Sequence, residues 1–538
     1  MTGDVTQPAG GARLGAEAVR ARIGGRGYHY VMPDTAVRQG AGTLAREVFE
    51  AQRRSFLADG PPSVAVRRAR MDKLLSAILD NSRAVVEAIG ADFGQRSAAA
   101  TLGTDILGPL SDVLYTRRHV GAWSRPRRVG PGLHSLGGVR AWVEPRPLGV
   151  VGIMAPWNFP VTLALQPAFA ALAAGNRVMI KVSEVTPRTA ECLRNIIVGS
   201  FDFSELAVVV GDAAVAAHFS ALPFDHLLFT GSPAVGKRVQ RVAADNLTPV
   251  TLELGGKNPA VVARDAKLEL AAARIAAGRM TNAGQLCLCP DYALVPRDLV
   301  PGFLRAVEAS LRKTWPSIAG NPQYPWVVNE QNYVRLQSLL TDAVDKGAEL
   351  RQIAPAGEPP STIANRWMPP TLVSRVTDDM RLAHEEVFGP VLSVVPYDTV
   401  DDVVSYVADR PSPLAAYWFG SAGADYRTFS SRVSCGGLTR NDFAVHALPN
   451  GAPFGGVGNS GSGYYHGRSG FDTFSHLRCT AQASTRFSMM TFATPPFSPR
   501  TEAAMDWSVR ALRRVTRGLA ARSQRAADRE AARALAGR

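Results

Sequence analysis

The sequence predicts an α/β protein made of two successive series of strands and helices. From residue 149 to 245, short apolar runs alternate with segments of helical spacing, and a second such series runs from about 259 to 442. Strands that alternate with helices form parallel sheets covered by helices, so each series predicts one sheet. A chain of 538 residues is long enough for two or three domains.

The first series contains the apolar run that comes closest to the length of a membrane span. It extends over 161–180, but Gln166, Pro167, Asn176 and Arg177 interrupt it. We therefore expect a buried helix followed by a strand. The elements expected in this series are strands at 149–154, 177–181, 206–210 and 226–230 and helices at 162–174, 188–199, 212–221 and 233–245.

The second series and the flanking segments complete the chain. A helical pattern over 46–93 is broken at Gly60-Pro61-Pro62, a Gly-rich segment covers 449–463, and 473–488 predicts a closing strand. Residues 1–45 have weak periodicity and the composition of a disordered extension. In the second series we expect strands at 260–262, 292–295, 392–395 and 415–419 and helices at 268–282, 299–314, 331–347 and 400–409.

The composition is that of an ordinary globular protein, with 46% hydrophobic and 20% charged residues. Five cysteines and no secretory signal argue against a disulfide framework and predict a reducing compartment, the cytoplasm. The net charge of +14 is unevenly distributed, because residues 501–538 hold nine arginines against four acidic residues. Such a tail could bind anionic lipid or nucleic acid, although a solvated helix or a frayed terminus is the simpler interpretation.

Two short motifs carry the groups of a covalent mechanism. Cys287 ends Gly284-Gln285-Leu286-Cys287, and Glu253 begins Glu253-Leu254-Gly255-Gly256-Lys257. A thiolate can add to an electrophilic carbon, and a carboxylate can activate the water that releases the product. Taken singly, a buried small Cys or a strand-end Glu in a salt bridge would be the simpler interpretation.

Asn158 is a candidate donor to a developing oxyanion. It lies in Pro156-Trp157-Asn158-Phe159-Pro160, directly after the strand expected at 149–154. An amide on a turn bounded by prolines could hold the substrate oxygen together with the backbone N–H of Cys287. The alternative is an Asn that caps the next helix.

Two further segments suggest a nucleotide site. Lys181 and Glu184 follow a strand at the edge of a parallel sheet where nucleotides bind, and each could bond ribose hydroxyls. Gly231 and Ser232 open a helix whose N-terminus would attract a pyrophosphate. Each signal is weak alone, since a solvated loop pair or an ordinary strand–helix turn would look the same.

A last motif adds a carboxylate and an aromatic ring beside a tight turn. In Glu385-Glu386-Val387-Phe388-Gly389-Pro390, Glu386 could hold a nicotinamide ribose and Phe388 could pack on the nicotinamide ring. Core packing by Phe388 with a surface Glu pair is the alternative. Cys289 is expected to be a buried small side chain, with a redox partnership with Cys287 as the other option.

Taken together, these motifs resemble the aldehyde dehydrogenase superfamily, over about residues 46–498. The Pro-Trp-Asn, Phe-Thr-Gly-Ser, Glu-Leu-Gly-Gly-Lys, Gly-Gln-x-Cys and Glu-Glu-Val-Phe-Gly-Pro segments occur in the family's order. Finer features resemble its class 3-like branch, with bacterial coniferyl aldehyde dehydrogenases nearest. They include Asp92–Ser97, Cys289–Tyr292, Asn441-Asp442, Pro453–Gly461, Tyr465–Gly467 and Phe471–His476.

The resemblance implies oxidation of an aldehyde to the carboxylic acid. Cys287 would attack the carbonyl, Asn158 would hold the oxyanion, and Glu253 would activate water to hydrolyse the thioester. The aldehyde would be aromatic, such as coniferaldehyde, or a medium- to long-chain aliphatic one. The cofactor would be NAD, with NADP as the alternative, because Glu184 would repel a 2′-phosphate. The residues implied in cofactor binding are Trp157, Lys181, Glu184, Gly231, Ser232, Glu386 and Phe388; no metal is implied.

The resemblance also implies a domain organisation and a homodimer. The chain would have a Rossmann-type NAD(P)-binding domain at 46–253 and a second α/β catalytic domain at 254–442. Residues 443–495 would return to the first domain. A small β oligomerisation arm would comprise 130–150 with 475–490. The basic tail at 496–538 could make weak contact with a membrane surface. No binding to a specific nucleic acid is expected.

Several positions depart from the branch. Val182 replaces a usual Pro in the adenosine loop, and Cys289 replaces a usual Ala. Leu286, Arg440 and Ala452 could reshape the aldehyde pocket. Two other functions stay open: an acylating enzyme or acyl reductase, against which Glu253 argues, and a catalytically silent protein that binds through its basic tail.

Overall fold

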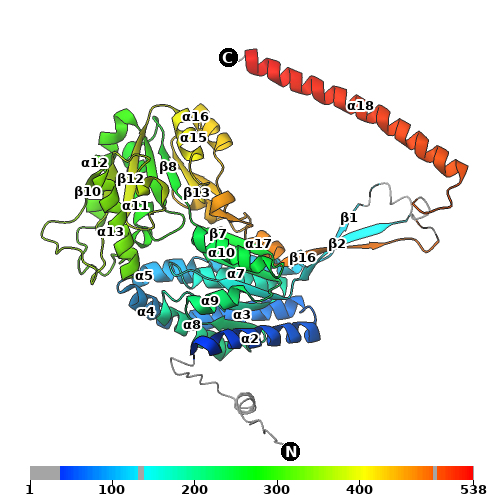
Figure 1. The fold of residues 1–538 in the computed structure, drawn as a ribbon, viewed down its shortest axis with the longest axis horizontal. Coiled ribbons are helices and arrows are strands. Elements are labelled where there is room, and N and C mark those ends of the chain that lie inside the picture. The colour runs from blue at the N-terminus through cyan, green and yellow to red at the C-terminus, as the bar shows by residue number, and fades with distance from the viewer. Residues whose placement is uncertain (1–36, 131, 133–137, 487, 489–492, 537–538) are drawn as a thin grey trace, which may run out of the picture. The chain divides into compact units, whose positions relative to one another are not determined.

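The computed structural model describes residues 37–130, 132, 138–486, 488 and 493–536 (Figure 1). They form two compact units. The first contains the chain up to Arg125 together with Pro145–Leu477, and the second contains Pro126–Glu144 and the chain from Arg478 onward. Both α/β series of the sequence fall in the first unit.

The first series forms a six-stranded sheet in the order β15-β7-β6-β3-β4-β5. All its neighbouring strands run parallel except β15, which pairs antiparallel with β7. The strands are β3 (Val150–Met154), β4 (Arg177–Lys181), β5 (Leu206–Val209), β6 (His226–Gly231), β7 (Val250–Leu254) and β15 (Gly461–Ser462). The predicted parallel sheet is confirmed.

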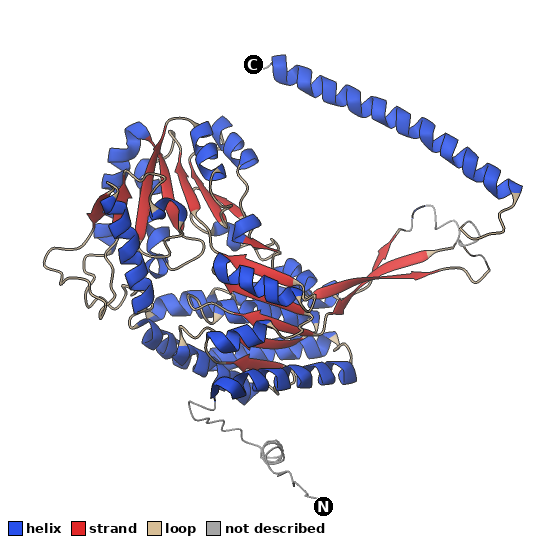
Figure 2. Ribbon diagram, in the orientation of Figure 1, coloured by secondary structure: helices blue, strands red, loops and turns tan. Residues whose placement is uncertain are grey.

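Helices cover both faces of this sheet, as Figure 2 shows. The helices of this part of the chain are α2 (Val37–Asp59), α3 (Val64–Asp80), α4 (Ser82–Phe93), α5 (Ala98–Thr101), the π-helical turn η1 (Leu102–Leu107), α6 (Leu110–Trp123), α7 (Thr162–Ala174), α8 (Pro187–Ser200), α9 (Ala213–Ser220), α10 (Pro233–Ala244) and α17 (Gly467–Thr473). Two cores result, because successive strand residues point to opposite faces. Val178 and Ile180 of β4 pack in one core and Met179 in the other.

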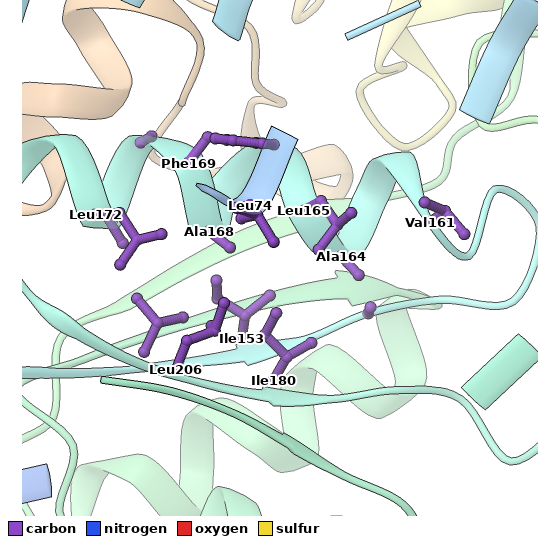
Figure 3. Close-up of a cluster of buried hydrophobic side chains, with 14 of the residues drawn as sticks. Leu74, Ile153, Val161, Ala164, Leu165, Ala168, Phe169, Leu172, Ile180 and Leu206 are labelled. Carbon is purple, nitrogen blue, oxygen red and sulfur yellow. The ribbon is translucent and has the colours of Figure 1, made fainter. Parts of the chain in front are cut away.

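The apolar run at 161–180 forms the centre of the first core. Its helix α7 and its strand β4 are almost wholly buried, so the helix-then-strand prediction is confirmed. Figure 3 shows Leu165, Ala168 and Leu172 of α7 facing Ile153, Ile180 and Leu206 of the sheet. Apolar positions on all sides of a helix are typical of one buried within a domain.

The second series forms a seven-stranded sheet in the order β10-β11-β12-β9-β8-β13-β14. Only β10 is antiparallel to its neighbour. The strands are β8 (Asn258–Val262), β9 (Pro290–Pro296), β10 (Glu349–Gln352), β11 (Thr371–Ser374), β12 (Val391–Tyr397), β13 (Ala415–Phe419) and β14 (Gly437–Arg440). Its helices are α11 (Leu268–Met280), α12 (Val300–Thr314), α13 (Glu330–Asp345), α14 (Arg381–His384), α15 (Val400–Ala408) and α16 (Ala424–Arg432), with 3₁₀ turns η3 (Thr281–Gly284), η4 (Arg297–Leu299) and η5 (Val445–Ala447). A further 3₁₀ turn, η6 (Gly458–Ser460), directly precedes β15 of the first sheet.

A small third sheet has the order β1-β2-β16, from β1 (Arg127–Val129), β2 (Arg140–Pro147) and β16 (Ser475–Gln482). β1 and β2 pair antiparallel. The chain ends in α18 (Pro499–Ala536), a helix of 38 residues. Among the described residues, no helix is both long and apolar enough to cross a bilayer.

Several element boundaries differ from the sequence predictions, most by one to a few residues, and two of them bear on the site or the core. The helix α2 begins at Val37, inside the segment expected as an extension, because Ala45 and Phe49 are fully buried in a core. The earlier residues of that segment lie outside the described part. The helix expected at 268–282 ends at Met280, where the chain turns into the candidate site.

Candidate active site

Cys287 follows a left-handed turn at the end of α11. Asn282, Ala283 and Gly284 have φ values of 51°, 52° and 74°. Side chains rarely adopt this conformation, and it costs energy for any residue except glycine. At Gly284 a Cβ would also lie 2.1 Å from the carbonyl oxygen of Gly389, so only glycine fits there. The helix therefore stops abruptly just before the thiol.

Gln285 fixes this turn to the segment at 326–328. Its side-chain amide donates to the carbonyl oxygens of Asn282 (2.9 Å) and Trp326 (3.0 Å). Its amide oxygen accepts from the backbone N–H of Val328 at 2.9 Å. Gln285 is fully buried, so every one of these bonds forms away from bulk water. This explains a glutamine two residues before the thiol.

The carbonyls of the turn are held from the other side by the second sheet. The amide of Asn258 on β8 donates to the carbonyl oxygens of Cys287 (2.6 Å) and Cys289 (3.0 Å). The hydroxyl of Tyr417 on β13 donates to that of Leu288 at 2.5 Å. The backbone around Cys287 is thus fixed by two strands before any substrate arrives.

Asn158 reaches this turn from the first sheet. It follows β3 and is 4% exposed, and its side-chain amide donates to the carbonyl oxygen of Gln285 at 3.1 Å. An amide carries two N–H groups, so one can be directed to a second acceptor. The structure therefore brings Asn158 beside the Cys287 turn, 127 residues later in the chain.

The backbone of Asn158 is held separately. Its carbonyl oxygen accepts from Arg96 at 2.9 Å and from Asn282 at 3.1 Å. Arg96 is ion-paired at 2.7 Å with Asp105, whose other oxygen accepts the N–H groups of Val161 and Thr162 at the start of α7. The sequence motif contained Arg96, but nothing in its pattern linked it to Asn158.

Glu253 lies on β7, next to β15 and β6. The residue is 3% exposed, and neither carboxylate oxygen has a hydrogen-bond partner among the described residues. A buried unpaired carboxylate is costly, and burial raises the pKa of Glu253 well above its usual range. Among the described residues no salt bridge involves Glu253. The alternative interpretation, a strand-end Glu in a salt bridge, therefore finds no support there.

The pKa of the Cys287 thiol shows which groups lie around it. Cys287 keeps some exposed surface, but the protein packed around its sulfur raises the pKa strongly, and the charges of Glu386 and Glu253 raise it further. The residue's own backbone N–H acts weakly in the opposite direction. The charges of Glu253 and Glu386 therefore act on Cys287, and its surroundings favour the protonated thiol.

Glu386 is held against the Gly255-Gly256 turn. A Cβ on Gly255 would overlap the Glu386 carboxylate, at 1.9 Å from Oε2. Burial, followed by the nearby Asp291, raises the pKa of Glu386 to about 8. The glycines after Glu253 are thus needed to let this carboxylate approach.

A buried ion cluster supports the Glu386 segment and the Cys287 turn together. Asp291 pairs with both Lys257 and Arg279 and accepts the backbone N–H of Val387 at 3.1 Å. Arg279 also donates to the carbonyl oxygens of Gly389 and Gly284. These residues position the site. Lys257 and Asp291 lay in quoted motifs without an assigned role and Arg279 lay in none, because their contacts are long-range.

Trp157 and Phe388, both expected on the cofactor side, lie in contact. Their ring centroids are 5.4 Å apart in an edge-to-face arrangement. Phe388 has a φ of 48°, a conformation that its flanking residues must enforce. The structure brings these two rings together beside Glu386 and Asn158, their neighbours in sequence.

The adenosine-side candidates lie at the carboxyl edge of the first sheet. Lys181 is 2% exposed and its ammonium group donates to the carbonyl oxygen of Val182 (2.7 Å) and to Glu184 (3.3 Å). Burial lowers the pKa of Lys181, against the charges of Glu184 and then Asp212. Asp212 follows the neighbouring strand β5, a strand-end position that the sequence interpretation passed over.

The residues present fit a dinucleotide in chemical terms. Ser232 caps α10 by accepting the N–H of Val235, which leaves a positive helix end at Gly231-Ser232. Gly236 lies so close to Leu254 that a Cβ there would clash, at 2.8 Å. Lys181 and Glu184 offer a donor and an acceptor, and Glu386 offers a second carboxylate near Cys287. Together they can bind two riboses and a pyrophosphate.

A cavity of about 280 Å³ lies near the candidate site, and its lining includes Phe159 and Asn282 but neither Asn158 nor Cys287. It lies between α5 and η1 of the first series and α11 and α12 of the second. Phe159 and Asn282 link it to the site, since they adjoin Asn158 in sequence and by hydrogen bond. Other lining side chains include Arg96, Ala277, Met280, Trp315 and Gln323. The wall is mostly apolar with a few polar groups, as in small-molecule sites.

Cys289 is buried, and its thiol lies 3.1 Å from the carbonyl oxygen of Gly278. Burial raises the pKa of Cys289 to about 12. Its position agrees with the prediction of a small buried side chain. Redox pairing with Cys287 stays a prediction.

Comparisons with known proteins identify the family and the fold. The chain matches the model of the aldehyde dehydrogenase family over residues 36–480. It is 42% identical over 430 residues to the coniferyl aldehyde dehydrogenase of Pseudomonas sp. strain HR199, covering 80% of this chain and 89% of that one.

Two solved structures share the fold. The substrate-bound AldH of Staphylococcus aureus has a TM-score of 0.80 and 33% identity, covering 86% of this chain and 99% of that one. The indole-3-acetaldehyde dehydrogenase AldA of P. syringae, solved with NAD⁺, has a TM-score of 0.75 and 26% identity, covering 82% and 89%. As the motifs predicted, this chain is an enzyme of the α/β class and belongs to the aldehyde dehydrogenase family, whose members oxidise aldehydes with NAD⁺ or NADP⁺.

Proposed function

We propose that this enzyme oxidises an aromatic or medium- to long-chain aldehyde to its carboxylic acid, with NAD⁺ as the preferred acceptor and Cys287 as the nucleophile. The meeting of Cys287, Asn158 and Glu253 carries the proposal. Asn158 follows β3 and Glu253 lies on β7 of the first sheet, and Cys287 lies on the turn before β9 of the second.

The first step forms a bond between the Cys287 sulfur and the carbonyl carbon. The thiol must first give its proton to water or to a nearby carboxylate, and its raised pKa opposes this transfer. Bound NAD⁺ supplies a positive charge and the acceptor for the hydride that leaves the same carbon. The second N–H of the Asn158 amide, with the backbone N–H of Cys287, stabilises the oxygen as it becomes negative.

Loss of hydride leaves a thioester on Cys287, which water then hydrolyses. Glu253 is the candidate base, because its two oxygens have no other partner among the described residues. It takes a proton from water as the new C–O bond forms and the C–S bond breaks. This role favours hydrolysis over acyl transfer to a second thiol.

The NAD⁺ preference is supported by carboxylates around Lys181. Glu184 is hydrogen-bonded to its ammonium group, and the charge of Asp212 also acts on it. A ribose 2′-hydroxyl can donate to a carboxylate, whereas a 2′-phosphate would be repelled. These carboxylates partly neutralise the positive charge of Lys181, so Lys181 is a weaker ligand for a 2′-phosphate.

The aldehyde class is supported by the cavity that Phe159 and Asn282 line. Its volume of about 280 Å³ and its aliphatic and aromatic wall suit a phenyl ring or an alkyl chain. For the small three-stranded sheet we propose the role of an arm that pairs two subunits into a homodimer.

The test is NADH or NADPH formation at 340 nm with a panel of aromatic and aliphatic aldehydes. We expect activity with NAD⁺ in the wild type and none in Cys287→Ala. No absorbance change with any aldehyde, with or without coenzyme A, would refute the proposal. Faster turnover with NADP⁺ would refute the assigned cofactor preference alone.

A further inference from the structure

The C-terminal helix α18 lies outside the matched family segment, which ends at residue 480. It carries large side chains in water. Met505, Val509, Leu512 and Leu519 are 40%, 56%, 62% and 56% exposed. An exposed row of this kind on a surface helix normally indicates a binding face.

These apolar side chains share one side of the helix. Met505, Val509, Leu512 and Leu519 follow one another at spacings of four, three and seven residues, which return to the same face of an α-helix. Val515, also more than half exposed, widens the stripe on one side. The stripe thus covers about four turns.

Arginines occupy the opposite side. By helical geometry Arg510, Arg514 and Arg517 lie away from the stripe, whereas Arg513 lies along its edge beside Val509. The segment 507–527 contains six arginines and no acidic residue. Arg510 makes an exposed 3.8 Å ion pair with Asp506, a contact of little strength. The helix is therefore amphipathic, with a concentrated positive charge.

We propose that α18 binds peripherally to an anionic phospholipid surface. The apolar stripe would enter the boundary between headgroups and acyl chains, while the long arginine side chains reach lipid phosphates. Each basic residue near such a surface adds to the attraction. Binding along the surface also agrees with the absence of a bilayer-spanning helix among the described residues.

Charge and polarity favour this partner over two others. If two α18 helices paired through their apolar stripes, the arginines beside one stripe would lie close to those of the other and repel them. Nucleic acid would neutralise the arginines but leave the stripe in water. An anionic bilayer satisfies both faces at once.

The experiment is co-sedimentation of the full-length protein with vesicles of phosphatidylcholine alone or with about one third phosphatidylglycerol. We expect binding only to the anionic vesicles, weakened by high salt. Arg513→Gln/Arg514→Gln/Arg517→Gln and Leu512→Ser/Leu519→Ser should each reduce the bound fraction at least tenfold. Melting temperature checks that each variant is folded.

A matched control removes three exposed arginines elsewhere, as Arg264→Gln/Arg297→Gln/Arg312→Gln. It has the same net charge as the first variant and should bind like the wild type. Equal losses in both arginine variants would overturn the proposal in favour of overall charge. The proposal would also be overturned if the protein did not bind anionic vesicles. This holds equally if α18 were found to drive self-association or to bind a DNA duplex instead.

Discussion

The backbone carbonyl and the side-chain amide of Asn158 make hydrogen bonds to different partners. The carbonyl is fixed by Arg96 and Asn282, and the amide is bonded to the Gln285 carbonyl. The side chain is thus already oriented before it meets the substrate oxygen. Preorganised donors of this kind stabilise charge with little rearrangement.

Asn158→Ala should reduce kcat by about 10²–10³-fold, the usual loss for one oxyanion donor. The backbone contacts to Arg96 should persist, so the fold should remain. Steady-state kinetics with melting curves will check this. A loss below tenfold would mean that the amide serves mainly to hold Gln285.

Protonation of Glu386 should make the stability of the fold depend on pH. The Glu386 pKa of about 8 lies above its ordinary value of 4.5, so the neutral carboxyl is favoured in the fold. The associated stability is fully present below about pH 4.5 and is lost as pH rises through 8. We expect the melting temperature of Glu386→Gln to rise relative to the wild type between pH 5 and 9.

The neighbouring Glu385→Gln is the control for that measurement, because Glu385 lies in an exposed ion pair with Arg381. It should follow the wild-type curve. If Glu386→Gln and the wild type run parallel over this range, the carboxyl is not buried against Gly255 as described.

At the scale of elements, the sequence predicted most of the sheets because their strands have distinct periodicity. Runs such as 177–181 became β4 with the same bounds. The end of α11 could not be predicted, since the residues 268–282 have helical spacing and only the Gly389 carbonyl explains the turn. Long-range contacts made by Arg96 and Arg279 likewise leave no local signal.

Gly284 tests the importance of that turn. Gly284→Ala should lower kcat at least tenfold, because the added Cβ would displace the backbone before Cys287. Gly320→Ala is the matched control, with a φ of 72° and open space around its Cβ. It should cost about 1 kcal/mol of stability and leave kcat unchanged. Equal kinetic effects would contradict this account.

At the scale of the molecule, the proposed active site draws its residues from both α/β series. The first contributes Asn158 and Glu253, and the second contributes Cys287 and Glu386. Sequence motifs identified these four residues, but the shape of the cavity depends on side chains far apart in the chain. The aldehyde class was therefore the least predictable feature.

Ala277→Trp should narrow the cavity, since Ala277 lines it from α11. We expect KM to rise at least tenfold for coniferaldehyde and much less for acetaldehyde. Ala309→Trp, on α12 and outside the lining, is the control and should leave both KM values unchanged. A uniform rise for both aldehydes would place the substrate elsewhere.

The central claim is that Cys287 carries the acyl group and Glu253 releases it. The direct measurement is rapid mixing of Glu253→Gln with NAD⁺ and an active aldehyde, followed by acid quench and peptide mass spectrometry. We expect a burst of one NADH per site, slow turnover, and the mass of the acyl group on the peptide that contains Cys287. A burst without that added mass, or no burst at all, would contradict the account.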